Sequence, residues 1–350
     1  MMRIEGEIQI CLEIKHLNIL CVALDGHRSQ ILLLGNGLEY ESGQRSWSQL
    51  VEDLTLPENR NITDVDKLPF PLRYELLSTP QNVTSPLTKN EIENEEKRLS
   101  NAMGKLVSES NPLLDMVPSL HMDHILTTNY SYCLEKAFFP SYNFQRANVR
   151  SKFRCYLTDK REVEYRLHTG YFCENVGTNG TCIWHIHGEC SVPQGIILGH
   201  DRYGRILSRI INCCNELSPR IGRSHRDTLT LISWPELFLV GDIYILGFGF
   251  DESEFDLWWL LRRKQREKYA DGRVYYYDKS LADEKDNVRY LLLRANGVNI
   301  LSLGADKYTP FNHFYHLAMQ DIKRRVMLQR GMPSALHAKS GLGALLAHSF

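Results

Sequence analysis

The chain has 350 residues, enough for one large domain or two modest ones, and its 43% hydrophobic and 24% charged residues are typical of a soluble globular protein. The formal net charge of −1 gives no indication of a general nucleic-acid or membrane-surface binder. No apolar run approaches the ~20 residues needed to span a bilayer, and the first residues include acids that a secretory signal lacks.

The nine cysteines are odd in number, and none of them is spaced C-x-x-C. Several lie inside apolar runs, which favours buried or free thiols in a reducing compartment over a disulfide framework. We therefore predict a cytoplasmic protein.

The first part of the chain predicts one βα unit followed by helices. Ile31–Leu34 is an apolar run of strand length that ends at Gly35, Asn36 and Gly37. A helical pattern follows, and a strand, a Gly-x-Gly turn and a helix are the opening of a nucleotide-binding βα unit. The helices expected here are Trp47–Leu54, Pro69–Ser78 and Thr88–Ser108, while residues 7–24 fit either a strand pair or a helix.

The stretch Ile125–Glu135 (ILTTNYSYCLE) combines a short buried strand, a polar turn and a helix start. The turn is formed by Thr127, Thr128 and Asn129, and the helix is expected over Tyr132–Phe139. An Asn at the carboxyl end of a strand lies where open α/β sheets hold their ligands. Asn is also an ordinary helix N-cap, so both interpretations stay open.

The second part of the chain continues the alternation of strands and helices. Residues 141–180 lose this rhythm and are interpreted as a small inserted module or a projecting hairpin, with strand-like segments at Phe153–Leu157 and Glu162–Leu167. The other strands expected are Thr181–His187, Gly195–Gly199, Asp242–Leu246, Val274–Tyr277 and Val298–Leu301. The helices expected are Tyr203–Leu217, Glu254–Lys268 with Ser253 and Asp256 as a capping box, Val288–Ala295 and Pro310–Met327.

This pattern predicts an α/β fold with a doubly wound, parallel, Rossmann-like sheet. We expect residues 1–330 to form one domain and residues 331–350 to be a loosely held tail.

Five polar clusters end predicted strands: Gly35–Gly37, Thr127–Asn129, His187–Gly188, Gly247–Gly249 and Asp278. The carboxyl ends of parallel strands share one edge of a sheet, so these clusters should converge. The two Gly-x-Gly turns suit phosphate groups, because glycine lets backbone N–H groups approach an anion closely. Neither turn is a full G-x-G-x-x-G fingerprint, and the absence of G-K-[ST] argues against a Walker-type NTPase.

His185 and His187 lie two positions apart on a predicted strand, so both should point to one face. One interpretation is a metal pair with Cys182 or Cys190 as a third ligand, and another is a core imidazole bonded to a carbonyl. The preferred interpretation makes His187 a general base or acid with a pKa near neutral. Ser/His/Asp hydrolysis is disfavoured because no G-x-S-x-G elbow is present.

The ordered motifs GNG, TTNY, HIHG, ILGHDRYG and LGFGFDESEFD resemble the sirtuin-like domains of bacterial NAD-consuming antiphage defence proteins, over roughly Ile31 to Leu303. The resemblance implies cleavage of the nicotinamide–ribose bond of NAD without a metal. It implies that Asn129 holds the nicotinamide ribose and the attacking water and that His187 is the catalytic histidine. The cofactor-binding residues it implies are Gly35, Asn36, Gly37, Thr128, Gly247, Gly249, Phe250 and Asp278.

Two departures from that family qualify the expectation. Protein-deacylating sirtuins carry two C-x-x-C pairs around a zinc ion, and this chain has none, which disfavours acyl-lysine hydrolysis. Family members often have an Asp two residues after the Asn, where this chain has Ser131. The partners expected are further copies of the same chain in a homo-oligomer and, as an additional option, a separate sensor protein. The rival hypotheses are a non-catalytic module that binds NAD or ADP-ribose and a zinc-free deacylase.

Overall fold

The computed structural model describes residues 21–22, 28–41, 43, 46–81, 86, 88–106, 111–140, 167–173, 180–223, 229–279 and 287–331. Among the helices in these ranges, none has an apolar stretch of the length that a membrane-spanning helix needs. The tail from 332 onward, the segment 141–166 and most of residues 7–24 lie outside the described residues. The predictions of a loose tail and of strands at Phe153–Leu157 and Glu162–Leu167 therefore stay predictions.

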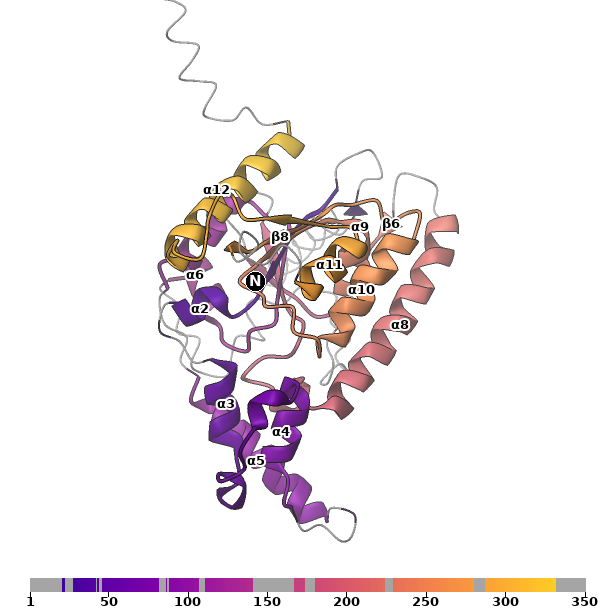
Figure 1. The fold of residues 1–350 in the computed structure, drawn as a ribbon. Helices are drawn as coiled ribbons and strands as arrows, with labels where there is room; N and C mark the ends of the chain where they lie inside the picture. Colours follow the sequence, from indigo (N-terminus) through magenta and orange to yellow (C-terminus); the bar gives the residue numbers. More distant parts are fainter. Residues whose placement is uncertain are drawn as a thin grey trace, which may run out of the picture.

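A seven-stranded sheet forms the centre of the molecule (Figure 1). Its strand order is β4-β5-β3-β2-β7-β8-β9, and every pair is parallel except the edge pair of β4 and β5. The strands are β2 (Gln30–Leu34), β3 (His124–Thr127), β4 (Tyr171–Cys173), β5 (Thr181–His185), β7 (Asp242–Leu246), β8 (Val274–Tyr277) and β9 (Val298–Leu301). The six parallel strands follow the order 3-2-1-4-5-6 of dinucleotide-binding sheets. The predicted fold class is confirmed.

The remaining elements cover this sheet or extend from it. The helices are α2 (Gly37–Glu41), α3 (Trp47–Leu54), α4 (Phe70–Ser78), α5 (Lys89–Gly104), α6 (Cys133–Phe138), α8 (His200–Arg223), α9 (Trp234–Val240), α10 (Phe255–Arg266), α11 (Val288–Ala295) and α12 (Phe311–Gln329). The 3-10 helices are η1 (Pro57–Asn59), η2 (Val65–Lys67), η3 (Leu114–Leu120) and η4 (Pro193–Gly195), and β1 (Cys21–Val22) pairs antiparallel with β6 (Leu229–Thr230).

The sheet buries both of its faces, which explains why its strands read as continuous apolar runs. Along β2, Ile31 and Leu33 pack into the cluster formed with α8, α9, α10 and α11, whereas Leu32 and Leu34 pack into the cluster formed with η3, α6 and α12. All four side chains are fully buried. Alternate residues of one strand therefore supply two cores, as the two-residue period of a strand requires.

A smaller lobe of α3, α4 and α5 lies below the sheet in Figure 1. Its apolar cluster includes Leu50, Leu77 and Leu99, together with Tyr130 and Ile196 from segments that follow strands of the main sheet. The lobe is thus packed against the edge at which the parallel strands end. The sequence predicted these helices as separate elements and did not predict that they form one lobe.

Three local predictions are wrong. Gly195–Gly199 is not a strand, because Gly195 ends the 3-10 helix η4 and the next N–H groups, those of Ile196 and Ile197, donate to the carbonyls of Pro193 (3.2 Å) and His187 (2.9 Å). Strand β5 ends at His185, so His187 lies in the turn beyond it. Residues 253 and 256 form no capping box: the N-cap of α10 is Glu254, and the Ser253 hydroxyl donates to Asp251.

Candidate functional site

The two Gly-x-Gly turns meet in space at the end of the central strand pair β2 and β7. The N–H of Gly35 donates to the Leu246 carbonyl (3.1 Å) and that of Gly37 to the Gly247 carbonyl (2.8 Å). A Cβ on Gly35 would lie 2.4 Å from the Gly247 oxygen, and one on Gly37 would lie 2.8 Å from the Gly247 Cα. Glycine is therefore required by the close approach of two backbones. These two N–H groups are bonded to carbonyls, and contact with a phosphate stays a prediction.

The other predicted cofactor contacts lie along the same edge. A Cβ on Gly249 would meet nothing within 4 Å, so its surroundings are open. Phe250 has a left-handed backbone (φ +49°), and its fully buried ring packs edge-on against Phe248 and Tyr276. The Asp278 Oδ2 accepts from the hydroxyls of Tyr276 (3.1 Å) and Tyr290 (2.8 Å).

Two further predicted contacts, Asn36 and Thr128, follow β2 and β3. Asn36 is half-buried, and its carbonyl accepts from the Tyr40 N–H (2.8 Å). Thr128 is buried, and its N–H donates to the Leu34 carbonyl (3.3 Å) at the end of β2. Both residues therefore lie at the carboxyl edge of the sheet, where the sequence placed them.

Asn129 lies just beyond β3, between the ends of β2 and β5. Its Nδ2 donates to the Gly35 carbonyl (3.3 Å) and to Glu39 Oε1 (2.8 Å), and its own N–H donates to Thr127 Oγ1 (3.1 Å). Its Oδ1 is buried and has no hydrogen-bond partner among the described residues. Asn129 is not the N-cap of α6, because that position is taken by Tyr132. The capping interpretation is therefore wrong: the side chain bonds Gly35 and Glu39 at the carboxyl edge of the sheet instead.

His185 holds the backbone of Asn129 in place. Its Nδ1 donates to the Asn129 carbonyl (2.8 Å), and its Nε2 faces Glu135 Oε1 at 2.7 Å. Burial lowers the pKa of this imidazole, but the carboxylates of Glu135 and Glu189 outweigh burial and raise the pKa to about 9. Both ring nitrogens are thus occupied, which argues against His185 as a metal ligand with Cys182 or Cys190.

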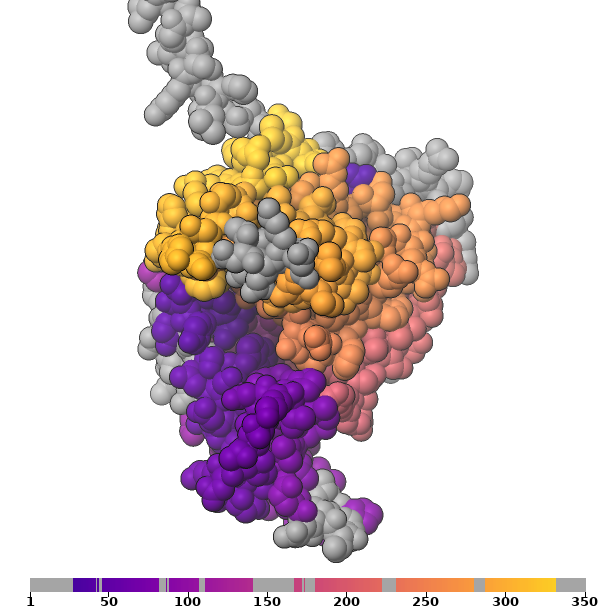
Figure 2. All heavy atoms as spheres, viewed as in Figure 1, coloured from indigo at the N-terminus to yellow at the C-terminus, as the bar shows by residue number. Residues whose placement is uncertain are grey.

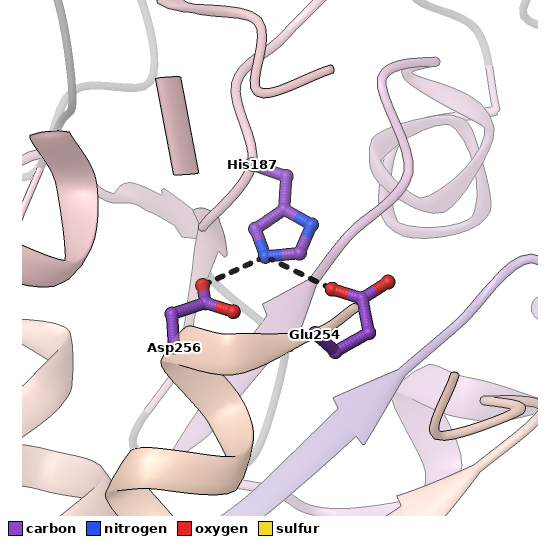
Figure 3. A group of neighbouring side chains, drawn as sticks. All are labelled: His187, Glu254 and Asp256. Atoms are coloured by element: carbon purple, nitrogen blue, oxygen red, sulfur yellow. Dashed lines mark hydrogen bonds and ion pairs between the residues drawn. The ribbon is translucent and has the colours of Figure 1, made fainter. Parts of the chain in front are cut away.

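His187 is fully buried, and its ring lies beside the start of α10 (Figure 3). Its Nε2 lies 2.9 Å from Asp256 Oδ2 and 3.8 Å from Glu254 Oε2. Burial lowers the pKa of His187, but these two carboxylates outweigh burial and raise it above its ordinary value. The other ring nitrogen, Nδ1, points away from both acids in Figure 3 and has no partner among the described residues. Nε2 of the imidazole is therefore bonded to an acid, whereas Nδ1 is a buried atom without a partner among the described residues.

In the described part of the chain, these same three side chains lie close enough together to hold a metal ion. One ligand atom from each of His187, Glu254 and Asp256 lies within 4.8 Å of the others. An imidazole nitrogen and two carboxylate oxygens are suitable donors for zinc. The direct bond between His187 and Asp256 accounts for the same geometry without an ion, so we do not propose a metal site here.

Three acidic side chains of the site were missed as site residues in the sequence. Glu39, Glu135 and Asp256 are each at most 4% exposed, and each bonds a predicted site residue or its neighbour. The available signal was position, because each acid lies in the first turn of the helix that follows a parallel strand. Figure 2 shows the surface recessed between the indigo residues that follow β2 and the orange residues near the start of α10.

Five of the six described cysteines are buried, as predicted: Cys133, Cys173, Cys182, Cys213 and Cys214, whereas Cys190 is half-buried.

The chain matches the model of a known protein family. The family model described as SIR2-like domain matches residues 123–301, just over half of the chain. The matched region contains Asn129, His187 and Asp256, whereas β2 and α2, which carry Gly35 and Glu39, precede it. No curated protein matches the chain.

Proposed function

Because this chain belongs to the SIR2-like domain family, we propose that it is an NAD glycohydrolase, which cleaves the nicotinamide–ribose bond of NAD to give nicotinamide and ADP-ribose. NAD-related activity follows from the family. The specific reaction is our proposal, and we assign it to residues of the single domain 1–330.

The proposal rests on two buried polar atoms at the edge of the sheet. Asn129 Oδ1 and His187 Nδ1 are buried acceptors without a partner among the described residues, and they follow the adjacent parallel strands β3 and β5. A buried polar atom left unbonded costs about 1–3 kcal/mol. Such atoms are retained where a ligand completes them, and here a ribose hydroxyl or a water would donate to each of them.

The chemistry needs little more than orientation and one proton acceptor. Breaking the N-glycosidic bond releases neutral nicotinamide and leaves oxocarbenium character on the ribose. Asn129 Oδ1 would accept from the attacking water or a ribose hydroxyl and hold it against the anomeric carbon. As the new C–O bond forms, His187 Nδ1 would take the proton that the water loses, and Asp256 would stabilise the resulting imidazolium.

The remaining predicted contacts belong to this proposal as well. Gly247, Gly249 and Asp278 would lie along the pyrophosphate and the adenosine ribose, on the side of β7 and β8. We also propose, from the sequence resemblance, that NAD is depleted in antiphage defence and that assembly of several copies gates the enzyme.

The test is to follow nicotinamide release from NAD by the purified full chain over a range of protein concentrations. Asn129→Ala and His187→Ala should each reduce kcat by roughly 10²–10⁴-fold, the range of a positioned acid–base group. Matched controls are Asn312→Ala and His313→Ala, which alter exposed side chains on α12 and should leave the rate unchanged.

Two results would contradict the proposal in different ways. A wild-type protein that releases no nicotinamide at any concentration removes the enzymatic claim, and tight NAD binding without turnover would identify a non-catalytic binding module. Full activity in both site variants would instead remove the assignment of Asn129 and His187.

A further inference from the structure

A buried carboxylate lies at the centre of the site and is not used by the chemistry proposed above. Glu39 is the second residue after Gly37, lies on the short helix α2 and is 4% exposed. Its Oε1 accepts from Asn129 Nδ2 and its Oε2 accepts from Ser131 Oγ, each at 2.8 Å. Burial raises the pKa of the Glu39 carboxyl, and the hydrogen bonds from Ser131 and Asn129 oppose this effect, so the position of this acid between two site residues needs an explanation.

The bonds of Glu39 decide how the Asn129 amide is oriented. A carboxamide can present either its oxygen or its nitrogen in a given direction, and the surrounding groups select one of the two. The Glu39 carboxylate and the Gly35 carbonyl are both acceptors, so the NH₂ group must face them. Oδ1 is then directed to the opposite side, where it has no partner in the described part of the chain.

The second oxygen of Glu39 ties the same carboxylate to the turn that carries Asn129. Ser131 is buried, and its hydroxyl also accepts from the Cys133 N–H at 3.4 Å. Glu39 therefore links α2, after the first parallel strand, to the start of α6, after the second. A displacement of this carboxylate would move the turn and the amide together.

We propose that Glu39 is the positioning residue of this site: its carboxylate, held between Asn129 and Ser131, turns the Asn129 amide so that Oδ1 faces the nicotinamide ribose and the attacking water. This inference rests on the proposed function of Asn129. Glu39 itself touches neither NAD nor the water. It acts through Asn129, and misplacing an oriented group by about 1 Å can cost ~10²-fold in rate.

The first test compares Glu39→Ala with Glu39→Gln. Glu39→Ala should lower kcat by roughly 10- to 100-fold with little change in KM, because orientation is lost while most NAD contacts remain. Glu39→Gln should lose less, because its carbonyl still accepts from Asn129 and its amide can donate to Ser131. Glu41→Gln, an exposed change on the same helix, is the control. Equal activity of Glu39→Ala and wild type overturns the proposal.

The second test adds a carboxylate at position 131 and then removes the one at position 39. Ser131→Asp places a second carboxylate against Glu39 and should lower kcat strongly. Adding Glu39→Gln removes the repulsion, so the double variant should be more active than Ser131→Asp alone. If the losses of the two single variants simply multiply, the two side chains act independently and the proposal fails.

A third measurement does not depend on turnover. In protein labelled with ¹⁵N at asparagine, the side-chain signal of Asn129 is identified by its absence in Asn129→Ala. This signal should shift or broaden in Glu39→Ala and stay near its wild-type position in Glu41→Gln. An unmoved signal in Glu39→Ala overturns the positioning role. If the wild type releases no nicotinamide, the proposed function fails while this signal still decides the role of Glu39.

Discussion

At the scale of single residues, Asp256 decides which nitrogen of His187 can accept a proton. Its Oδ2 lies 2.9 Å from Nε2, so the ring proton resides on Nε2 and leaves Nδ1 as the acceptor. The carboxylates of Asp256 and Glu254 also favour the imidazolium, which raises the pKa of His187 despite burial. A general base must be neutral to act, so activity should rise with pH through this raised pKa.

Asp256→Asn should therefore have two effects. The acidic limb of the kcat/KM profile should move to lower pH, because removing the anion lowers the pKa of His187. The maximal rate should also fall by roughly 10²–10⁴-fold, because an amide can donate to Nε2 and move the ring proton to Nδ1. The check is nicotinamide release as a function of pH, with the exposed Glu252→Gln as control. An unshifted acidic limb would show that His187 is not the titrating base.

At the scale of secondary-structure elements, α10 is joined to the end of α9 by a buried lysine. Lys264 is 4% exposed, and its Nζ donates to the carbonyls of Phe238 (3.1 Å), Leu239 (2.7 Å) and Gly241 (2.8 Å). A cation at a helix C-terminus satisfies carbonyls that have no partner within the helix. Helix α10 starts with the acids beside His187, so this bond helps to fix the position of that start.

Lys264→Met should lower the free energy of unfolding by about 1–3 kcal/mol, because buried carbonyls lose their donor. The difference between wild type and variant should depend on pH. Burial lowers the pKa of Lys264 from 10.5 to about 7, so between these values the unfolded chain binds more protons than the folded one. The wild type should therefore gain stability relative to Lys264→Met as pH rises through this window. Urea unfolding at two pH values measures it, with the exposed Lys268→Met as control. A difference that is constant with pH would contradict the shifted pKa.

At the scale of the whole molecule, the close contact of the two Gly-x-Gly turns joins β2, the first strand of the seven-stranded sheet, to β7, more than 200 residues later. Gly35→Ala would place a Cβ 2.4 Å from the Gly247 oxygen, whereas Gly249→Ala would meet nothing within 4 Å. We expect Gly35→Ala to lower the free energy of unfolding by roughly 1–3 kcal/mol or more and Gly249→Ala to change it little. Chemical denaturation of both variants measures this, and equal stability would show that the turns do not touch.

Much of the fold could be predicted because it depends on local patterns. Apolar runs such as Ile31–Leu34 and Asp242–Leu246 end abruptly at glycine or polar residues, and helical spacing follows each of them. Alternation of this kind requires parallel strands, and parallel strands place their carboxyl ends on one edge. The sequence by itself therefore determined the fold class and the edge on which Asn129 and His187 lie.

Only the tertiary structure decided which side chains meet at that edge. Glu39 bonds Asn129 across 90 residues of sequence, and His187 bonds Asp256 across 69. Such pairs depend on strand order and register, which the periodicity of a single segment does not encode. For the same reason β5 ends before His187, since the end of a strand is set by its neighbours' hydrogen bonds as well as by its own residues.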